Sequence, residues 1–174
     1  MDLKKNLCDN IKECELKIGY REAEIGLYYP ESSLLELLDT DKDGLEQAIS
    51  RFTQEVSEEL GAVSIVPTQE KGRYCITVPK EGISYVHQTI EASLFLCDFI
   101  HEVKLPGKSL AEIIKVFYRY SDAVVVEKDS PKEWAVSFAD DSIDPYIYYI
   151  EEDAFGLEYH RFTHEAYRFL KEER

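Results

Sequence analysis

The densest group of side chains that could do chemistry lies near the end of the chain, at Tyr159, His160, Arg161 and His164. The forked N–H donors of Arg161 suit a carboxylate or phosphate, with Tyr159 and His160 beside it. His160 and His164 are four residues apart, so they could share a metal ion if both lay on one helix. However, the internal Glu of the H-E-x-x-H arrangement is absent, and Thr163 could cap a helix between the two histidines. We therefore favour structural hydrogen bonds here, with an anion site as the alternative.

A second candidate is the run from Asp39 to Gly44, which matches the first six positions of a calcium-binding loop. Such a loop takes side-chain oxygens from positions 1, 3 and 5, here Asp39, Asp41 and Asp43. Position 12 should be a bidentate Glu, but Ser50 stands there. We therefore expect a connecting turn in which Asp43 caps the next helix. The sequence predicts no metal and no other cofactor.

Carboxylates also gather late in the chain, with six acids and no base in residues 140–153, namely Asp140, Asp141, Asp144, Glu151, Glu152 and Asp153. Paired carboxylates could hold magnesium or act as general acid and base. Nothing in the sequence indicates the burial that shifts a carboxylate pKa, so we expect a solvated charge run in turns. A nucleophile elbow, a phosphate loop and a dinucleotide fingerprint are absent, which favours a non-enzymatic protein.

The elements that must position these residues begin with a long amphipathic helix over residues 43–61, where apolar residues recur at helical spacing and Gly61 can end the helix. Alternation over 63–78 predicts a hairpin with a charged tip. Before these elements we expect a helix over 2–19, a strand ending at Pro30, and a short apolar helix with a capping box of Ser33 and Glu36.

This order of helix, strand, helix, helix, strand, wing and strand resembles a winged-helix domain over residues 2–88. The run from Ile76 to Val86, Ile-Thr-Val-Pro-Lys-Glu-Gly-Ile-Ser-Tyr-Val, is similar to the strand-to-helix exit of many such domains. The runs Gly19-Tyr20-Arg21 and Leu27-Tyr28-Tyr29-Pro30 also resemble an uncharacterised bacterial family with no assigned activity. Neither resemblance implies a function.

The exposed face of the long helix argues against the DNA binding that is common in winged-helix domains. Residues 44–60 hold four acids and one base, where a DNA-reading helix carries basic and amide side chains. This face would repel a duplex, whereas binding normally gains from counterion release. We therefore expect no DNA binding through this helix.

The composition supports the same conclusion for the whole chain, which has 35 acids, 20 bases and a formal net charge of −15 in 174 residues. The acids are spread evenly, with 17 in residues 1–86 and 18 in residues 87–174. Such a surface disfavours nucleic acid and anionic membrane as partners but is compatible with a basic protein. No apolar run has the length or position of a signal peptide or a membrane-spanning helix. The four cysteines are scattered along the chain, as is typical of reduced, mostly buried thiols. We therefore expect a cytoplasmic protein.

In the second half, we expect a helix over 83–101, either continuous or broken near residues 89–93, and another helix started by a capping box of Ser109 and Glu112. Four short strands between 123 and 162 predict an antiparallel meander, and Thr163 can cap a last helix. The predicted fold class is α+β, with a winged-helix-like domain over 1–88 and an α+β domain over 89–174 that pack together. The predicted function is a protein-interaction or regulatory module. The alternative is a small protein or enzyme that binds an anion through Tyr159, His160 and Arg161.

Overall fold

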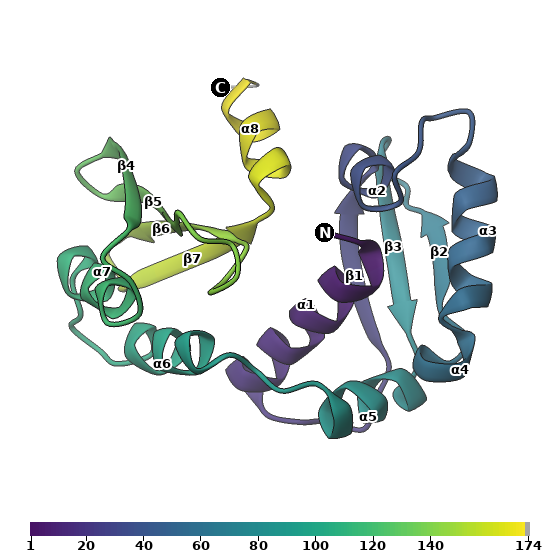
Figure 1. The fold of residues 1–174 in the computed structure, drawn as a ribbon, viewed down its shortest axis with the longest axis horizontal. Helices are drawn as coiled ribbons and strands as arrows, with labels where there is room; N and C mark the ends of the chain where they lie inside the picture. Colours follow the sequence, from purple (N-terminus) through teal and green to yellow (C-terminus); the bar gives the residue numbers. More distant parts are fainter. Residues whose placement is uncertain (173–174) are drawn as a thin grey trace. The chain divides into compact units, whose positions relative to one another are not determined.

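The computed structural model describes residues 1–172 and has an α+β fold (Figure 1). The chain divides into two compact units, an N-terminal unit of Met1–Ala92 and a C-terminal unit of Ser93–Arg174. Each unit contains its own antiparallel sheet with helices around it. None of the described helices is long and apolar enough to cross a membrane.

The N-terminal unit contains a three-stranded sheet in which β3 lies between β1 and β2. Both pairings are antiparallel, with Ile25 opposite Val78 and Ser64 opposite Thr77. In chain order its elements are α1 (Leu3–Ile18), β1 (Ile25–Pro30), α2 (Glu31–Leu37), α3 (Leu45–Glu55), α4 (Ser57–Leu60), β2 (Ser64–Pro67), β3 (Arg73–Val78) and α5 (Lys80–Thr89). The predicted first helix, first strand and hairpin are therefore confirmed.

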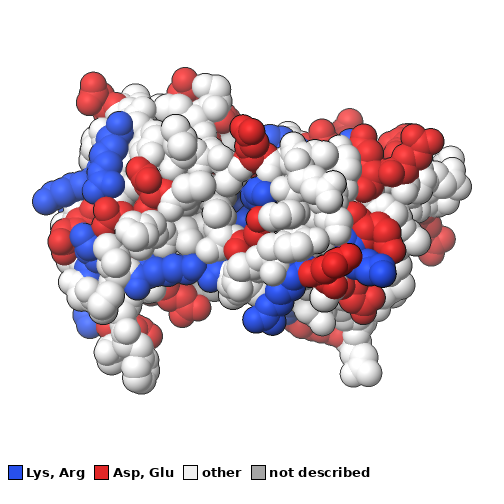
Figure 2. Space-filling view, turned by 90° about the horizontal axis from the view of Figure 1, so that it is seen from below, with Lys and Arg blue, Asp and Glu red and all other residues white. Residues whose placement is uncertain are grey.

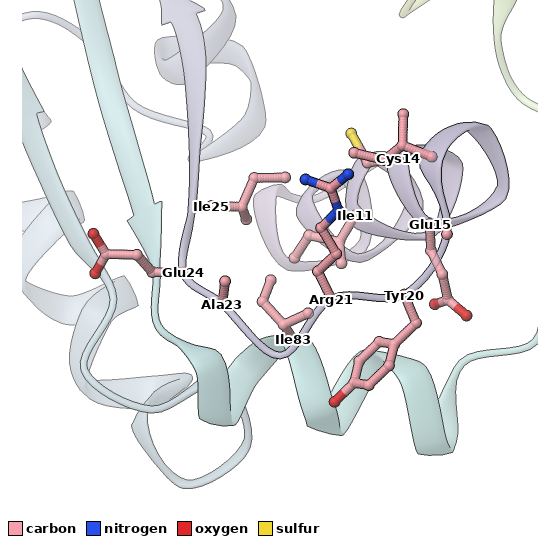
Figure 3. Close-up of a pocket in the computed structure, with 11 residues that line it drawn as sticks. Ile11, Cys14, Glu15, Tyr20, Arg21, Ala23, Glu24, Ile25 and Ile83 are labelled. Carbon is pink, nitrogen blue, oxygen red and sulfur yellow. The ribbon is translucent and has the colours of Figure 1, made fainter.

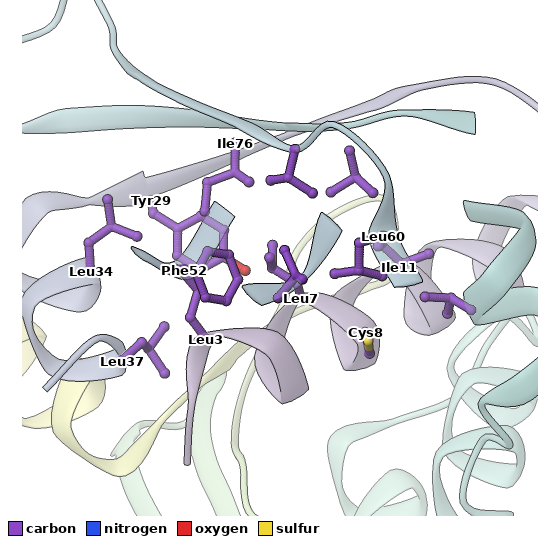
Figure 4. Close-up of a cluster of buried hydrophobic side chains, with 14 of the residues drawn as sticks. Leu3, Leu7, Cys8, Ile11, Tyr29, Leu34, Leu37, Phe52, Leu60 and Ile76 are labelled. Carbon is purple, nitrogen blue, oxygen red and sulfur yellow. The ribbon is translucent and has the colours of Figure 1, made fainter. Parts of the chain in front are cut away.

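The core of this unit lies between one face of the sheet and the apolar stripes of the helices (Figure 4). Leu7 of α1, Leu34 of α2 and Ile76 of β3 are among its fully buried side chains. Alternation along β1 points Tyr29 into this core while Tyr28 is exposed on the outer face. The stripe predicted from helical spacing thus forms the interior of the unit.

The long helix predicted over residues 43–61 is wrong in one respect, because the structure divides it at Val56 into α3 and α4. Val56 has φ −90° and ψ −3°, outside the ideal helix. The Ser57 hydroxyl donates to the Gln54 carbonyl at 2.7 Å, which satisfies an acceptor near the break. The bend keeps both Val56 and Leu60 buried in the core. Gly61 ends the segment with φ 72°, as predicted.

Two predicted helix caps in this unit are also wrong. The N-cap of α3 is Gly44 and no side chain caps the helix, so Asp43 does not have the predicted role. Helix α2 begins at Glu31, two residues before the predicted cap at Ser33. The backbone N–H of Glu31 donates to the carbonyl of Gly72 at 2.8 Å. This contact with the hairpin turn satisfies a free donor of the first helical turn, which a side chain would otherwise cap.

The C-terminal unit has the predicted four-stranded antiparallel meander, in the order β4-β5-β6-β7. Its elements are α6 (Leu94–Val103), α7 (Leu110–Tyr118), β4 (Val124–Ser130), β5 (Glu133–Phe138), β6 (Ile147–Glu152), β7 (Leu157–Phe162) and α8 (His164–Glu172). The capping box of Ser109 and Glu112 is present at the start of α7. Thr163 caps α8, since its hydroxyl oxygen accepts from the N–H of Ala166 at 3.1 Å.

The two faces of this sheet have different coverings. One face packs against α6 and α7 through aromatic rings that meet mostly edge to face, with centroids 4.6 Å apart for Phe99 and Tyr148. The other face carries Ile147 and Tyr149, which pack with Tyr167 of α8. A side chain on β6 or β7 therefore lies under the α6–α7 pair or on the α8 face, according to its place in the alternation.

Candidate functional site

The cluster predicted at Tyr159, His160 and Arg161 does not converge on one site, because it lies on β7, where successive side chains point to opposite faces. Tyr159 is buried, with its ring centroid 4.8 Å from that of Phe99 in α6. Arg161 lies on the same face, whereas the His160 side chain lies on the α8 face and is 55% exposed. The hypothesis of a shared anion site therefore has to be corrected.

Arg161 belongs instead to a polar group around Asp144. Its guanidinium carbon lies 4.4 Å from the ring centroid of Tyr146. The Tyr148 hydroxyl donates to Oδ2 of Asp144 at 3.0 Å, and Oδ1 of Asp144 accepts from the N–H of Tyr146 at 3.1 Å. Burial and then the charge of Asp144 raise the pKa of Tyr148 well above its usual value, although Arg161 acts against them.

Asp144 also corrects the prediction that residues 140–153 form a solvated run, because this carboxylate is buried. One oxygen accepts from the backbone N–H of Tyr146, just before β6, and the other accepts from the Tyr148 hydroxyl within β6, so these contacts hold the segment before β6 onto the sheet. Asp140 and Asp153, by contrast, are exposed and close turns through bonds to nearby backbone N–H groups. The hydrogen bonds of Asp144 therefore stabilise the fold of the C-terminal unit.

His164, the remaining residue of the predicted cluster, lines a cavity of about 250 Å³ between the α8 face of the sheet and α8. Its Nε2 is 3.3 Å from Oδ1 of Asp141, and Ser137 lines the same cavity. A serine, a histidine and an aspartate thus surround one space. Within residues 1–172, however, no hydrogen bond joins the Ser137 hydroxyl to His164, so the three residues do not form an assembled triad.

The predicted calcium-loop residues form a connecting turn between α2 and α3. Asp39 has φ 48°, a left-handed conformation. An oxygen of Asp41 accepts from the backbone N–H of Gly44 at 2.9 Å, and this bond closes the turn. In the part of the chain that the structure describes, no group of three or more His, Cys, Asp or Glu side chains is placed to hold a metal ion.

The surface of α3 and α4 that faces away from the core is acidic. Leu45, Ala48 and Phe52 hold α3 onto the core. The exposed side chains are Glu46, Gln47, Ser50, Arg51, Gln54, Glu55, Ser57 and Glu58. Within this set, Arg51 is the only base, and its Nε lies 3.9 Å from an oxygen of Glu55. We call this set the α3 surface.

A cavity that was not predicted from the sequence lies in the N-terminal unit, beside the last turns of α1, the loop 19–24, the start of β1 and α5 (Figure 3). Its volume is about 250 Å³. Most of its lining is aliphatic or small, namely Ile11, Cys14, Ile18, Gly19, Ala23, Ile25 and Ile83. The polar lining residues are Glu15, Tyr20, Arg21 and Glu24. We call this cavity the α1–β1 pocket.

The rim of the α1–β1 pocket is held by contacts between the loop, α1 and α5. The ring of Tyr20 stacks on that of His87, with centroids 3.9 Å apart and planes inclined by 18°. The Tyr20 hydroxyl is 3.0 Å from the Ser84 hydroxyl. His87 Nδ1 lies 2.8 Å from an oxygen of Glu15, and Lys12 donates to the other oxygen at 3.0 Å. These contacts fix one wall of the pocket.

The charge on Glu15 is compensated within this rim. Burial raises the pKa of its carboxyl, but the hydrogen bonds with His87 and Lys12 outweigh that effect and the pKa is lowered overall. Glu15 therefore remains a carboxylate that is already paired. The sequence held one signal of this pocket, because an aromatic residue and a basic residue, Tyr20 and Arg21, directly follow the Gly that ends α1.

The fold defines an α+β protein with a separate antiparallel sheet in each unit. The chain belongs to the family described as "Domain of unknown function, E. rectale Gene description (DUF3877)", and the match covers residues 1–170. This match confirms the resemblance to an uncharacterised family that the sequence indicated. No curated protein matches the chain, and no solved structure matches it.

Proposed function

We propose that this protein is a non-enzymatic interaction or regulatory module, and that its N-terminal unit is a winged-helix-like scaffold that binds another protein. The proposal is supported by the order of elements from α1 to β3 and by the sheet order β1-β3-β2. In a winged-helix domain, the helix at the place of α3 is the one presented to a partner. The α3 surface is therefore the expected contact region.

The acidity of the α3 surface carries the proposal. It places Glu46, Glu55 and Glu58 in solvent with a single exposed base, Arg51. A DNA duplex would be repelled, because much of the affinity of such helices comes from contacts between basic side chains and phosphates. A protein with a basic surface would be attracted, and the attraction would weaken as salt rises.

The rest of the molecule is consistent with a protein partner in the cytoplasm. On the face drawn in Figure 2, Lys and Arg side chains lie beside Asp and Glu side chains and do not gather into a broad basic patch. Cys8, Cys14, Cys75 and Cys97 are all free thiols, which suits a reducing compartment. The cytoplasm is therefore part of this proposal.

The test compares two full-length variants that change the net charge equally. The double variant Glu46→Lys/Glu55→Lys changes the α3 surface, and the control Asp122→Lys/Glu91→Lys changes exposed acids elsewhere. We expect a protein captured from native extract by the wild type and by the control to be lost from the α3 variant. Circular dichroism would check that each variant is folded.

A fluorescence-anisotropy titration with a labelled DNA duplex at low salt completes the test. We expect no binding by the wild type. Tight binding to the duplex, or capture of the same partner by all three proteins, would contradict the proposal.

A further inference from the structure

The α1–β1 pocket is a half-open, mainly apolar hollow on a single folded unit. Its walls include Ile11 of α1, Ile25 of β1 and Ile83 of α5. Small-molecule sites have this character, with an apolar lining and a few polar groups that orient the ligand. An apolar cavity of about 150 Å³ accommodates benzene, so a volume of about 250 Å³ has room for about ten non-hydrogen atoms.

The charge at this pocket favours an anion. Figure 3 shows the Arg21 guanidinium between Ile25 and Cys14, at the side of the pocket. Within residues 1–172 this guanidinium forms no ion pair and no hydrogen bond. Glu15 is already paired with Lys12 and His87, and Figure 3 shows the Glu24 carboxylate directed away from the other lining side chains. Arg21 is therefore the charge available to a ligand.

We propose that the α1–β1 pocket binds a small organic carboxylate with an apolar body. The apolar body would occupy the space between Ile11, Ile25 and Ile83, and the carboxylate would pair with Arg21. A guanidinium presents two parallel N–H donors that match the two oxygens of a carboxylate. This inference is independent of the proposed protein partner, because the pocket and the α3 surface share no residue.

The ligand would contact α1, the loop 19–24, β1 and α5 of the N-terminal unit. Ile11 and Cys14 come from α1, Arg21 and Ala23 from the loop, and Ile83 from α5. A molecule bound among them would stabilise this unit, because it binds the folded chain and not the unfolded one. Binding would thus be detectable both directly and as increased thermal stability.

The experiment uses hexanoate and benzoate as probes, with hexanamide and benzamide as uncharged analogues of the same shape. Binding to the full chain is measured by calorimetry and located by backbone amide NMR shifts. For ligands of this size we expect a Kd on the order of a millimolar for the carboxylates. The amides should bind at least about tenfold more weakly, because they lose the charge-assisted bonds to Arg21. The largest shifts should fall on residues 11–25 and 83.

Two variants and one control sharpen the test. Arg21→Gln should weaken carboxylate binding at least about tenfold and leave amide binding unchanged, because only the charge-assisted bonds are lost. Ala23→Leu, which adds bulk to the lining, should weaken both classes of probe. Arg73→Gln removes an exposed Arg of the same unit that is paired with Glu70, outside the pocket, and should change neither.

Three outcomes would overturn the proposal. One is equal affinity for the carboxylate and its amide. Another is unchanged carboxylate binding by Arg21→Gln. The third is NMR shifts confined to residues outside the pocket. None of these results bears on the α3 surface, so the failure of one proposal is distinguishable from the failure of the other.

Discussion

The hydroxyl of Tyr148 donates a hydrogen bond to Oδ2 of Asp144 at 3.0 Å, and both side chains are buried. Tyr148 lies on β6, and Asp144 precedes that strand. A carboxylate without solvent needs such donors, because a buried charge that loses its hydrogen bonds is costly. The pair therefore ties the segment before β6 to the interior of the C-terminal unit.

Tyr148→Phe should destabilise the C-terminal unit by about 1–3 kcal/mol, because the Asp144 carboxylate would lose a donor while it stays buried. Trp134 on β5 is the single tryptophan of the chain, so its fluorescence during urea unfolding reports on this unit. Tyr118→Phe, at an exposed tyrosine, is the matched control and should change the stability by less than about 0.5 kcal/mol. An equal effect of both variants would contradict the structural role of the pair.

Gly82→Ala should destabilise the N-terminal unit by about 1–3 kcal/mol, because the added methyl group overpacks the junction of α4 and α5. A Cβ at residue 82 would lie 2.5 Å from the carbonyl oxygen of Leu60 and 2.7 Å from a methyl carbon of Val78. Thermal unfolding followed by circular dichroism measures the effect. The control is Gly26→Ala, whose Cβ would make an ordinary contact of 3.5 Å with the sulfur of Cys75. If Gly26→Ala lost more stability than Gly82→Ala, the close packing of Leu60 and Val78 around Gly82 would be wrong.

Cys8 should resist alkylation in the folded protein at pH 8. Burial raises the pKa of its thiol to about 11, with a smaller contribution from the charge of Asp9. A thiol with this pKa is about 0.1% thiolate at pH 8, against about 20% in an unfolded chain, so the rate should be at least about a hundredfold lower.

The measurement for Cys8 is peptide mass spectrometry after timed treatment with iodoacetamide, with the urea-unfolded protein as control. Folding favours the neutral form of the Cys8 thiol. The contribution of this preference to the stability of the folded protein is therefore fully present below the pKa of the thiol in the unfolded chain. It is lost as the pH rises through about 11. Equal alkylation rates in the folded and unfolded protein would rule out the buried position of Cys8.

The sequence by itself determined the elements and many of their ends, because these depend on neighbouring residues. Asp2 lies at the start of α1, and its side chain accepts from the N–H of Lys5. Ser109 and Glu112 form their capping box within a single helical turn. The alternation in β4 to β7 predicted the meander, since adjacent strands joined by short turns pair with one another. The α+β class followed from these local signals.

Alternation along β7 could also have separated His160 from Tyr159 and Arg161, once the strand had been placed. The hypothesis of a shared anion site assumed that residues adjacent in the chain are also close in space. Within a strand, adjacent residues point to opposite faces, so this step was wrong. The separation of His160 from Tyr159 and Arg161 could therefore be predicted from strand geometry alone, without the tertiary structure.

Only the tertiary structure decided the remaining features, because burial depends on residues far apart in the chain. The break at Val56 lets Leu60 reach a core built largely from other elements. Asp144 is buried by the sheet, although Asp140 and Asp141 in the same connection are exposed. The α1–β1 pocket forms where Ile83 of α5 lies against α1 and the loop that carries Arg21. Helix ends and strand pairs follow from local chemistry, whereas cavities and buried charges arise only when distant segments pack together.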